Sequence, residues 1–179
     1  MTTMDPAVDI ALRSGLALLL LVAAGHKLSD RAHFRATLAE YRLLPEWSVS
    51  VAAVGVVSVE VAIAVTLVVF RAAGALAAAT LLGVYAAAIG VNLTRGRRHI
   101  DCGCAGPTER RPLSGWLVAR NGALVVTALA GLVPLGTRPF VWVDGITISG
   151  SFALLATVYA TVDGLIANAP GFTRLRGAA

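Results

Sequence analysis

This chain has almost no cysteine and little charge. Two of its 179 residues are cysteines, and charged residues make up only 14% of the sequence. Two cysteines separated by one residue cannot form the set of bridges that supports small secreted domains, so that class is excluded. An ordinary soluble domain of this length is also excluded, because such domains contain about a quarter charged residues.

Apolar residues take the place of the missing charge. They make up 57% of the sequence, and the mean hydropathy is +0.77. A run of about 20 apolar residues crosses a bilayer as a helix, and the length suits one domain. The sequence predicts a single all-α integral membrane domain over residues 1–179, with a four-helix transmembrane core and a fifth span. The expected spans are residues 7–25, 49–70, 72–93, 116–135 and 146–167.

One polar stretch, residues 29–44, is predicted to form an amphipathic helix at the membrane interface. Ser29 or Asp30 is expected to cap it, and Pro45 to end it. Its apolar residues recur at helical spacing, whereas most of its charged residues lie elsewhere. The apolar positions are Leu28, Phe34, Leu38, Tyr41 and Leu44.

The basic residues predict how the spans are oriented. The net charge is +5, but no nucleic-acid-binding motif is present, and the arginines gather in the gaps between spans. Loops rich in Lys and Arg stay in the cytoplasm. We therefore expect a multi-pass inner (plasma) membrane protein with its N-terminus outside and its cysteine loop and C-terminus inside. The cytoplasmic group is Lys27, Arg31, Arg35, Arg42, Arg95, Arg97, Arg98, Arg110, Arg111, Arg174 and Arg176, and the opposite side has Arg71 and Arg138.

The two cysteines, Cys102 and Cys104, lie in a loop over residues 94–115 that is rich in glycine and arginine. A disulfide between them closes a very small, strained ring, which is easily reduced. His99 and the neighbouring arginines favour thiolate, whereas Asp101 opposes it. The pair therefore predicts thiol–disulfide exchange. Two other readings stay open: an idle pair in a turn, and a Zn or Cu(I) site.

The metal reading rests on three ligands, His99, Cys102 and Cys104, with Asp101 or His26 as the fourth. Imidazole and thiolate suit both metals, but the usual two-pair cysteine spacing is absent. No cofactor is identified from the sequence, and both a quinone and these metals stay open.

Glu60 lies near the centre of the second span, where a carboxylate costs at least ~2.5 kcal/mol unless it is paired or protonated. Arg13, inside the first span, is its candidate partner. A direct role in chemistry and a tether between helices are both consistent with this position.

A second polar group is expected at one depth beneath the cysteine loop, counting ~1.5 Å per helical residue. Arg120 and Asp163 form a natural ion pair within it. The group either positions the loop and tunes its thiols, or holds the bundle together. Its members are His26, Lys27, Asn92, Arg120, Asn121 and Asp163.

Taken together, these positions resemble the methylamine utilisation MauE family, which is similar to the DoxX-like group of small membrane proteins. The resemblance covers residues 7–131. It rests on Gly25-His26-Lys27-Leu28, Tyr41-Arg42-Leu43-Leu44-Pro45, Glu60, Asn92-Leu93, Cys102-Gly103-Cys104 and Arg120-Asn121.

The resemblance implies a membrane protein that acts with a thioredoxin-like partner in redox maturation of other proteins. Cys102 and Cys104 would be the redox pair of a thiol–disulfide oxidoreductase. The supporting positions would be Lys27, Glu60, Asn92, His99, Arg120 and Asp163. The rival hypothesis is a non-enzymatic scaffold subunit of a larger membrane complex, whose cysteine loop is structural or binds metal. Whether the chain is an enzyme stays open at this stage.

Overall fold

The computed structural model describes residues 3–102, 112–139, 141–154, 156–158 and 161. Its named helices are α1 (Pro6–Ser29), α2 (Arg31–Glu40), α3 (Val49–Val69), α4 (Arg71–Thr94) and α5 (Gly115–Ala130), with a 3-10 turn, η1 (Glu46–Ser48), before α3. An apolar helix follows, Trp142–Val158. The described residues form no named strand, which confirms the all-helical class.

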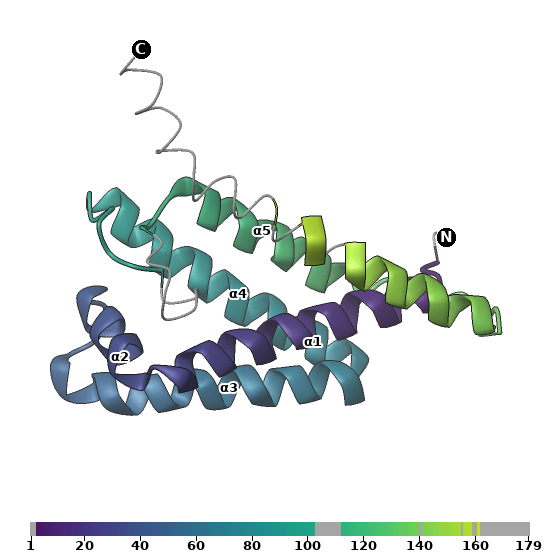
Figure 1. Ribbon diagram of the computed structural model, residues 1–179, viewed down its shortest axis with the longest axis horizontal. Helices are drawn as coiled ribbons and strands as arrows, with labels where there is room; N and C mark the ends of the chain where they lie inside the picture. The colour runs from purple at the N-terminus through teal and green to yellow at the C-terminus, as the bar shows by residue number, and fades with distance from the viewer. Residues whose placement is uncertain (1–2, 103–111, 140, 155, 159–160, 162–179) are drawn as a thin grey trace, which may run out of the picture.

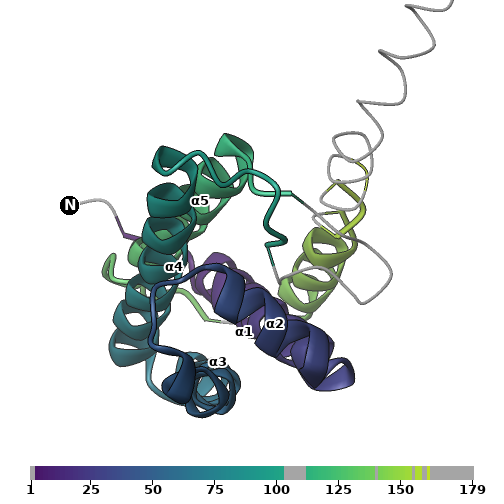
Figure 2. The same ribbon diagram turned by 90° about the vertical axis from the view of Figure 1, so that its left-hand side faces the viewer.

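The long helices lie side by side (Figure 1). The helix α3 packs against both α1 and α4, and α4 packs on α5. Their connections fall at two ends of the bundle. We call one of them the cysteine end. The helices α1 and α4 end there, residues 95–102 lie there, and α5 begins there (Figure 1). The short helix α2 also lies at this end, in front of α1 and in contact with α3 (Figure 2).

Local signals explain where several helices begin and end. Asp5 caps α1 by accepting a hydrogen bond from the backbone N–H of Ala7, and Pro6 occupies the first helical position. Asp30 caps α2 through the N–H of His33, as one of the two candidates predicted. The helix α2 ends at Glu40 and is therefore shorter than the helix expected over residues 29–44.

Three helices, α1, the segment Glu46–Val69 and α4, are each long and apolar enough to cross a membrane. The helix α5 falls short of that length at 16 residues, although a span over residues 116–135 was expected. It ends at Ala130 because Gly131 begins a turn and Pro134, further on, has no N–H to continue a helix. Near the fifth expected span, residues 146–167, the structure has a shorter apolar helix, Trp142–Val158, so the count of five spans stays a prediction. Most residues after Val158 lie outside the described ones.

The main core lies where α1, α3, α4 and α5 meet. Leu20 of α1, Leu67 of α3 and Leu82 of α4 are each no more than 2% exposed, and small alanines fill the space between the helices. Alanine and glycine allow close approach of helices, which matters in a bilayer because apolar side chains gain little from leaving lipid.

The closest approach lies at the turn between α3 and α4, at Gly74. A Cβ at this position would lie 2.5 Å from Leu67 Cα and 2.6 Å from Leu67 N, both backbone atoms. We therefore expect Gly74→Ala to lower the free energy of unfolding by about 1–3 kcal/mol. The matched control is Gly83→Ala, where no atom lies within 4 Å. Reversible unfolding in mixed micelles measures both. Equal stability of the two variants would contradict this account of the turn.

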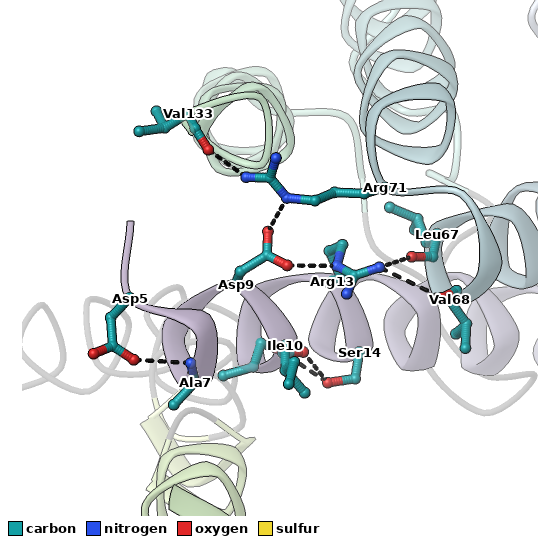
Figure 3. A network of polar contacts seen from close by, with 11 residues as sticks. Asp5, Ala7, Asp9, Ile10, Arg13, Ser14, Leu67, Val68, Arg71 and Val133 are labelled. Carbon is teal, nitrogen blue, oxygen red and sulfur yellow. Dashed lines mark hydrogen bonds and ion pairs between the residues drawn. The ribbon is translucent and has the colours of Figure 1, made fainter. Parts of the chain in front are cut away.

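Arg13 lies at the end opposite the cysteine end, in a network around the buried Asp9 (Figure 3). Its Nε donates to Asp9 Oδ2 at 2.9 Å, and its Nη1 donates to the carbonyl of Leu67 at 3.0 Å. Arg71 donates to the other Asp9 oxygen at 2.9 Å and to the carbonyl of Val133. The prediction that Arg13 pairs with Glu60 was therefore wrong.

A second ion cluster at this end is centred on Arg138. Its guanidinium contacts Asp5 at 2.5 Å and Asp144 at 2.6 Å, which ties the start of α1 to the start of the last helix. These hydrogen bonds hold the pKa of each aspartate below its usual value and raise the pKa of Arg138. Both predicted cations of this end, Arg71 and Arg138, are thus paired with carboxylates.

Candidate functional site

The chain leaves α4 through a tight turn that directs it toward the cysteines. Gly96 has a φ of +74°, in the left-handed region that favours glycine. The N–H of Arg97 then donates to the carbonyl of Asn92 at 3.0 Å, which closes the end of the helix. Residues 97–102 therefore fold back over the end of the bundle instead of extending away from it.

Cys102 lies in a second apolar cluster at the cysteine end and is 8% exposed. Its neighbours come from the residue that follows α2, from α4, from α5 and from the loop itself, so several elements define its position. The cluster contains Tyr41, Ile89, Ile100, Cys102, Leu113 and Leu117. Cys104, the other predicted redox cysteine, lies outside the described residues.

Two side chains at α2 contact the segment that carries Cys102. His33 Nε2 lies 3.0 Å from Asp101 Oδ2, and the Tyr41 hydroxyl donates to the carbonyl of Cys102 at 3.4 Å. On the other side, the N–H of Leu113 donates to the carbonyl of Ile100 at 3.0 Å. The segment is therefore held between α2 and the start of α5.

A groove of about 470 Å³ opens beside this segment. It lies between the end of α2 and residues 97–100, and its lining mixes both signs of charge. Its residues are Ala39, Glu40, Arg42, Glu46, Arg97, His99 and Ile100. His99, predicted as a supporting residue, is exposed at the edge of this groove. Arg42 has a φ of +47°, a strained conformation for a residue with a side chain.

Below the cysteine end, Lys27 and Glu60 form a buried ion pair, with Lys27 Nζ 2.5 Å from Glu60 Oε1. Glu60 is fully buried, and Lys27 is 5% exposed. The hydroxyl of Tyr85 donates to the same carboxylate oxygen at 2.7 Å. The ammonium group also lies 5.5 Å and 5.6 Å from the ring centres of Phe34 and Tyr85, close enough for cation–π attraction.

This arrangement gives Glu60 two donors on one oxygen. Its other oxygen, Oε2, is buried and has no hydrogen-bond partner among the residues that the structure describes. Phe34 of α2 covers the ammonium, so α2 contacts both this ion pair and the cysteine segment. The two predicted supporting residues Lys27 and Glu60 are thus direct partners, which the sequence did not reveal.

The other supporting residues are separate from this pair. Asn92 is fully buried, and its amide donates to the carbonyl of Ala88 one turn earlier in α4. Asn121 makes the same kind of bond to Leu117 within α5. Arg120 is half-buried. Its predicted partner, Asp163, lies outside the described residues, so the Arg120–Asp163 pair remains a prediction.

The proposed metal site includes Cys104, which lies outside the described residues, so it stays a prediction. Among the described residues, no three His, Cys, Asp or Glu side chains gather closely enough to hold an ion. Asp101, one proposed ligand, pairs with His33.

Sequence reasoning missed three residues that shape this site. Tyr85 carried one signal, as a single phenol in an Ala-rich apolar helix. Tyr41 was predicted only as part of an apolar face, and His33 was not singled out. A contact between α2 and a loop some 60 residues later leaves no periodic pattern in either segment.

The fold and the site together define an all-helical membrane protein, with a cysteine segment at one end of its bundle and a buried Lys–Glu pair beneath. The model of the family described as "Methylamine utilisation protein MauE" matches residues 5–134. The chain belongs to this family. Its similarity to the DoxX-like group remains a prediction.

The chain is similar to three methylamine utilization MauE proteins along most of its length. The protein of Paracoccus denitrificans is 41% identical over 167 residues, which is 89% of each chain. That of Paracoccus versutus is 38% identical and covers 97% of this chain and 96% of its own. That of Methylophilus methylotrophus is 34% identical, covering 89% and 86%. No solved structure matches the chain.

Proposed function

We propose that this protein is a membrane thiol–disulfide exchange protein that works with a thioredoxin-like partner in the redox maturation of other proteins. The observation that carries the proposal is the position of Cys102, held by α2 and α5 at the end of the bundle where basic side chains are exposed. Because the relatives are named for methylamine utilisation, we place the maturation step within that process.

Charge supports a cytoplasmic position for the cysteine end. Five arginines are exposed there, whereas Arg13, Arg71 and Arg138 at the opposite end are each bound to an aspartate. Such an asymmetry favours the cytoplasm for the cysteine end, and the N-terminus then lies outside. The same charges would attract an acidic face of a soluble partner. The exposed residues are Arg31, Arg35, Arg42, Arg95 and Arg98.

The proposed reaction is a reversible two-step exchange. One cysteine of the Cys102–Cys104 pair, as thiolate, attacks a disulfide of the partner, forms a mixed disulfide and releases one partner thiolate. The second cysteine attacks the mixed disulfide, closes the Cys102–Cys104 bond and releases the other partner thiol. Two electrons and two protons have then passed to the partner. In this direction, a reduced thioredoxin-like protein or a quinol would return two electrons and two protons to the Cys102–Cys104 bond.

The burial of Cys102 favours a second candidate function. A cysteine that is 8% exposed within an apolar cluster behaves more like a packing residue than like a reactive thiol. On this alternative the protein is a non-enzymatic scaffold subunit, and the cysteine segment holds the end of the bundle together.

Oriented membrane vesicles separate the two functions. The strained Cys102–Cys104 bond is easily reduced, so the exchange is run in the direction in which this protein is reduced. Vesicles containing the oxidised protein would be mixed with reduced thioredoxin, and the thioredoxin thiols lost would be counted. We expect thioredoxin to be oxidised with inside-out vesicles, which present the cytoplasmic face, and not with right-side-out vesicles.

The control for this experiment is the Cys102→Ser/Cys104→Ser protein in the same vesicles. If the double variant assembles normally and oxidises thioredoxin as fast as the native protein, the exchange function is wrong and the scaffold is favoured. Oxidation of thioredoxin with right-side-out vesicles alone would instead reverse the proposed orientation while supporting exchange.

A further inference from the structure

Exchange at Cys102 requires access that the closed arrangement does not give. A partner sulfur must approach the thiol in line with the bond that breaks, and Cys102 is 8% exposed among apolar side chains. The segment that carries it must therefore open, at least locally, before reaction. The contacts that hold the segment closed then control how often the thiol is presented.

On the α2 side, polar contacts of described residues hold the segment. His33 and Asp101 form a charge-assisted pair at 3.0 Å, and the Tyr41 hydroxyl binds the Cys102 carbonyl at 3.4 Å. Arg97 Nη1 also reaches the carbonyl of Tyr41, at 3.5 Å. These contacts join two segments about 60 residues apart, and two of them act on the Asp101-Cys102 dipeptide itself.

The helix that supplies these groups is firmly held. Asp30 caps α2 through the N–H of His33, and the side chains of Phe34 and Thr37 are buried beneath it. By contrast, the His33 side chain is one-third exposed, so a docking partner can reach the pair with Asp101. A rigid helix with an accessible polar contact suits a clamp that opens when a partner binds.

We propose that His33 and Tyr41 are positioning residues that clamp Asp101 and Cys102 against α2 and so set the access of a partner to the Cys102 thiol. The assignment rests on the proposed exchange function. His33 acts through the carboxylate next to the cysteine, and Tyr41 acts through the cysteine's own backbone carbonyl.

The test is the rate at which a maleimide alkylates Cys102 in the purified Cys104→Ser protein, where Cys102 is the only thiol. Loss of a charge-assisted bond in His33→Ala is expected to raise the rate about tenfold. Tyr41→Phe keeps the ring in the cluster and removes only the hydroxyl, so about threefold is expected. Ala36→Ser, at an exposed position on the same helix with no charge, is the matched control and should leave the rate unchanged.

Two further variants separate a clamp from a general loss of structure. His33→Gln retains a side-chain donor for Asp101 and should restore a near-native rate. In an Asp101→Ala background, His33→Ala should add nothing, because the partner that it acts on is gone. If His33→Ala acted through a general loss of structure, it would raise the alkylation rate both with the native Asp101 and in the Asp101→Ala background. It would also lower the unfolding temperature.

The clamp and the exchange function fail in different ways. Unchanged alkylation in both His33→Ala and Tyr41→Phe overturns the clamp, whatever the thioredoxin assay shows. Faster alkylation of Cys102, with no oxidation of thioredoxin by the two-cysteine protein, overturns the exchange function. His33 and Tyr41 would then still control access to the Cys102 thiol. Full support requires faster alkylation of Cys102 in these variants together with cysteine-dependent exchange in the native protein.

Discussion

Replacing Lys27 by methionine is expected to lower the free energy of unfolding by about 3–5 kcal/mol. The change leaves the Glu60 carboxylate fully buried without its cation, and breaking a buried pair by removing one partner has a penalty of this size. The Tyr85 hydroxyl remains as a donor to Glu60, but a phenol does not replace a positive charge. Reversible unfolding in mixed micelles, followed by tryptophan fluorescence, measures the loss.

The double variant Lys27→Met/Glu60→Gln controls for the loss of packing. It removes both charges, and we expect it to recover most of the stability lost in Lys27→Met, since replacing a whole buried pair is often close to neutral. Glu60→Gln alone should be destabilised, because the ammonium then lacks its carboxylate. A Lys27→Met protein within 1 kcal/mol of the native one would show that the pair does not hold the helices together.

The second large effect is expected when a cysteine is replaced, and it is on the rate of thiol–disulfide exchange with thioredoxin. Serine at either position, Cys102 or Cys104, is expected to lower thioredoxin turnover at least about a hundredfold, since a hydroxyl cannot form the disulfide that completes the cycle. The two variants should then differ in what accumulates. The one that retains the attacking cysteine stops at the mixed disulfide, whereas the one that retains the resolving cysteine accumulates none.

A non-reducing gel, with mass spectrometry of the shifted band, distinguishes these outcomes and assigns the attacking cysteine. The matched control is the variant with both serines. If both single variants turn over thioredoxin at the native rate, the cysteines do not carry the reaction.

The positions of the long helices were predictable because both the lipid and the protein core favour long runs of apolar residues in the sequence. The ends of α3 and α4 lie within one residue of those expected, since charged or turn-forming residues interrupt the hydrophobic pattern there. The end of α5 was predicted five residues too late. Residues 131–135 are apolar enough to continue the span, but Gly131 and Pro134 favour a non-helical turn, which ends the helix.

The partners within the site were less predictable. A carboxylate at Glu60 stood out because of the penalty for burying a charge, but its position in the sequence does not give its depth in the bundle. Arg13 lies at the opposite end of the bundle, where it donates to the carbonyl of Leu67 in α3. Leu67 is seven helical residues, or about 10 Å, beyond Glu60 along that helix. Lys27 reaches Glu60 because α1 ends against the middle of α3, with α2 folded over the ammonium.

The most direct test of the central claim is the thiol count of the purified protein across a series of glutathione redox buffers. If Cys102 and Cys104 form an exchanging pair, a maleimide should count two thiols in reducing buffers and none in oxidising ones, with both lost together in a single two-electron transition. Two thiols that persist across the series, or that disappear one at a time as glutathione adducts, would contradict a Cys102–Cys104 disulfide and the function built on it.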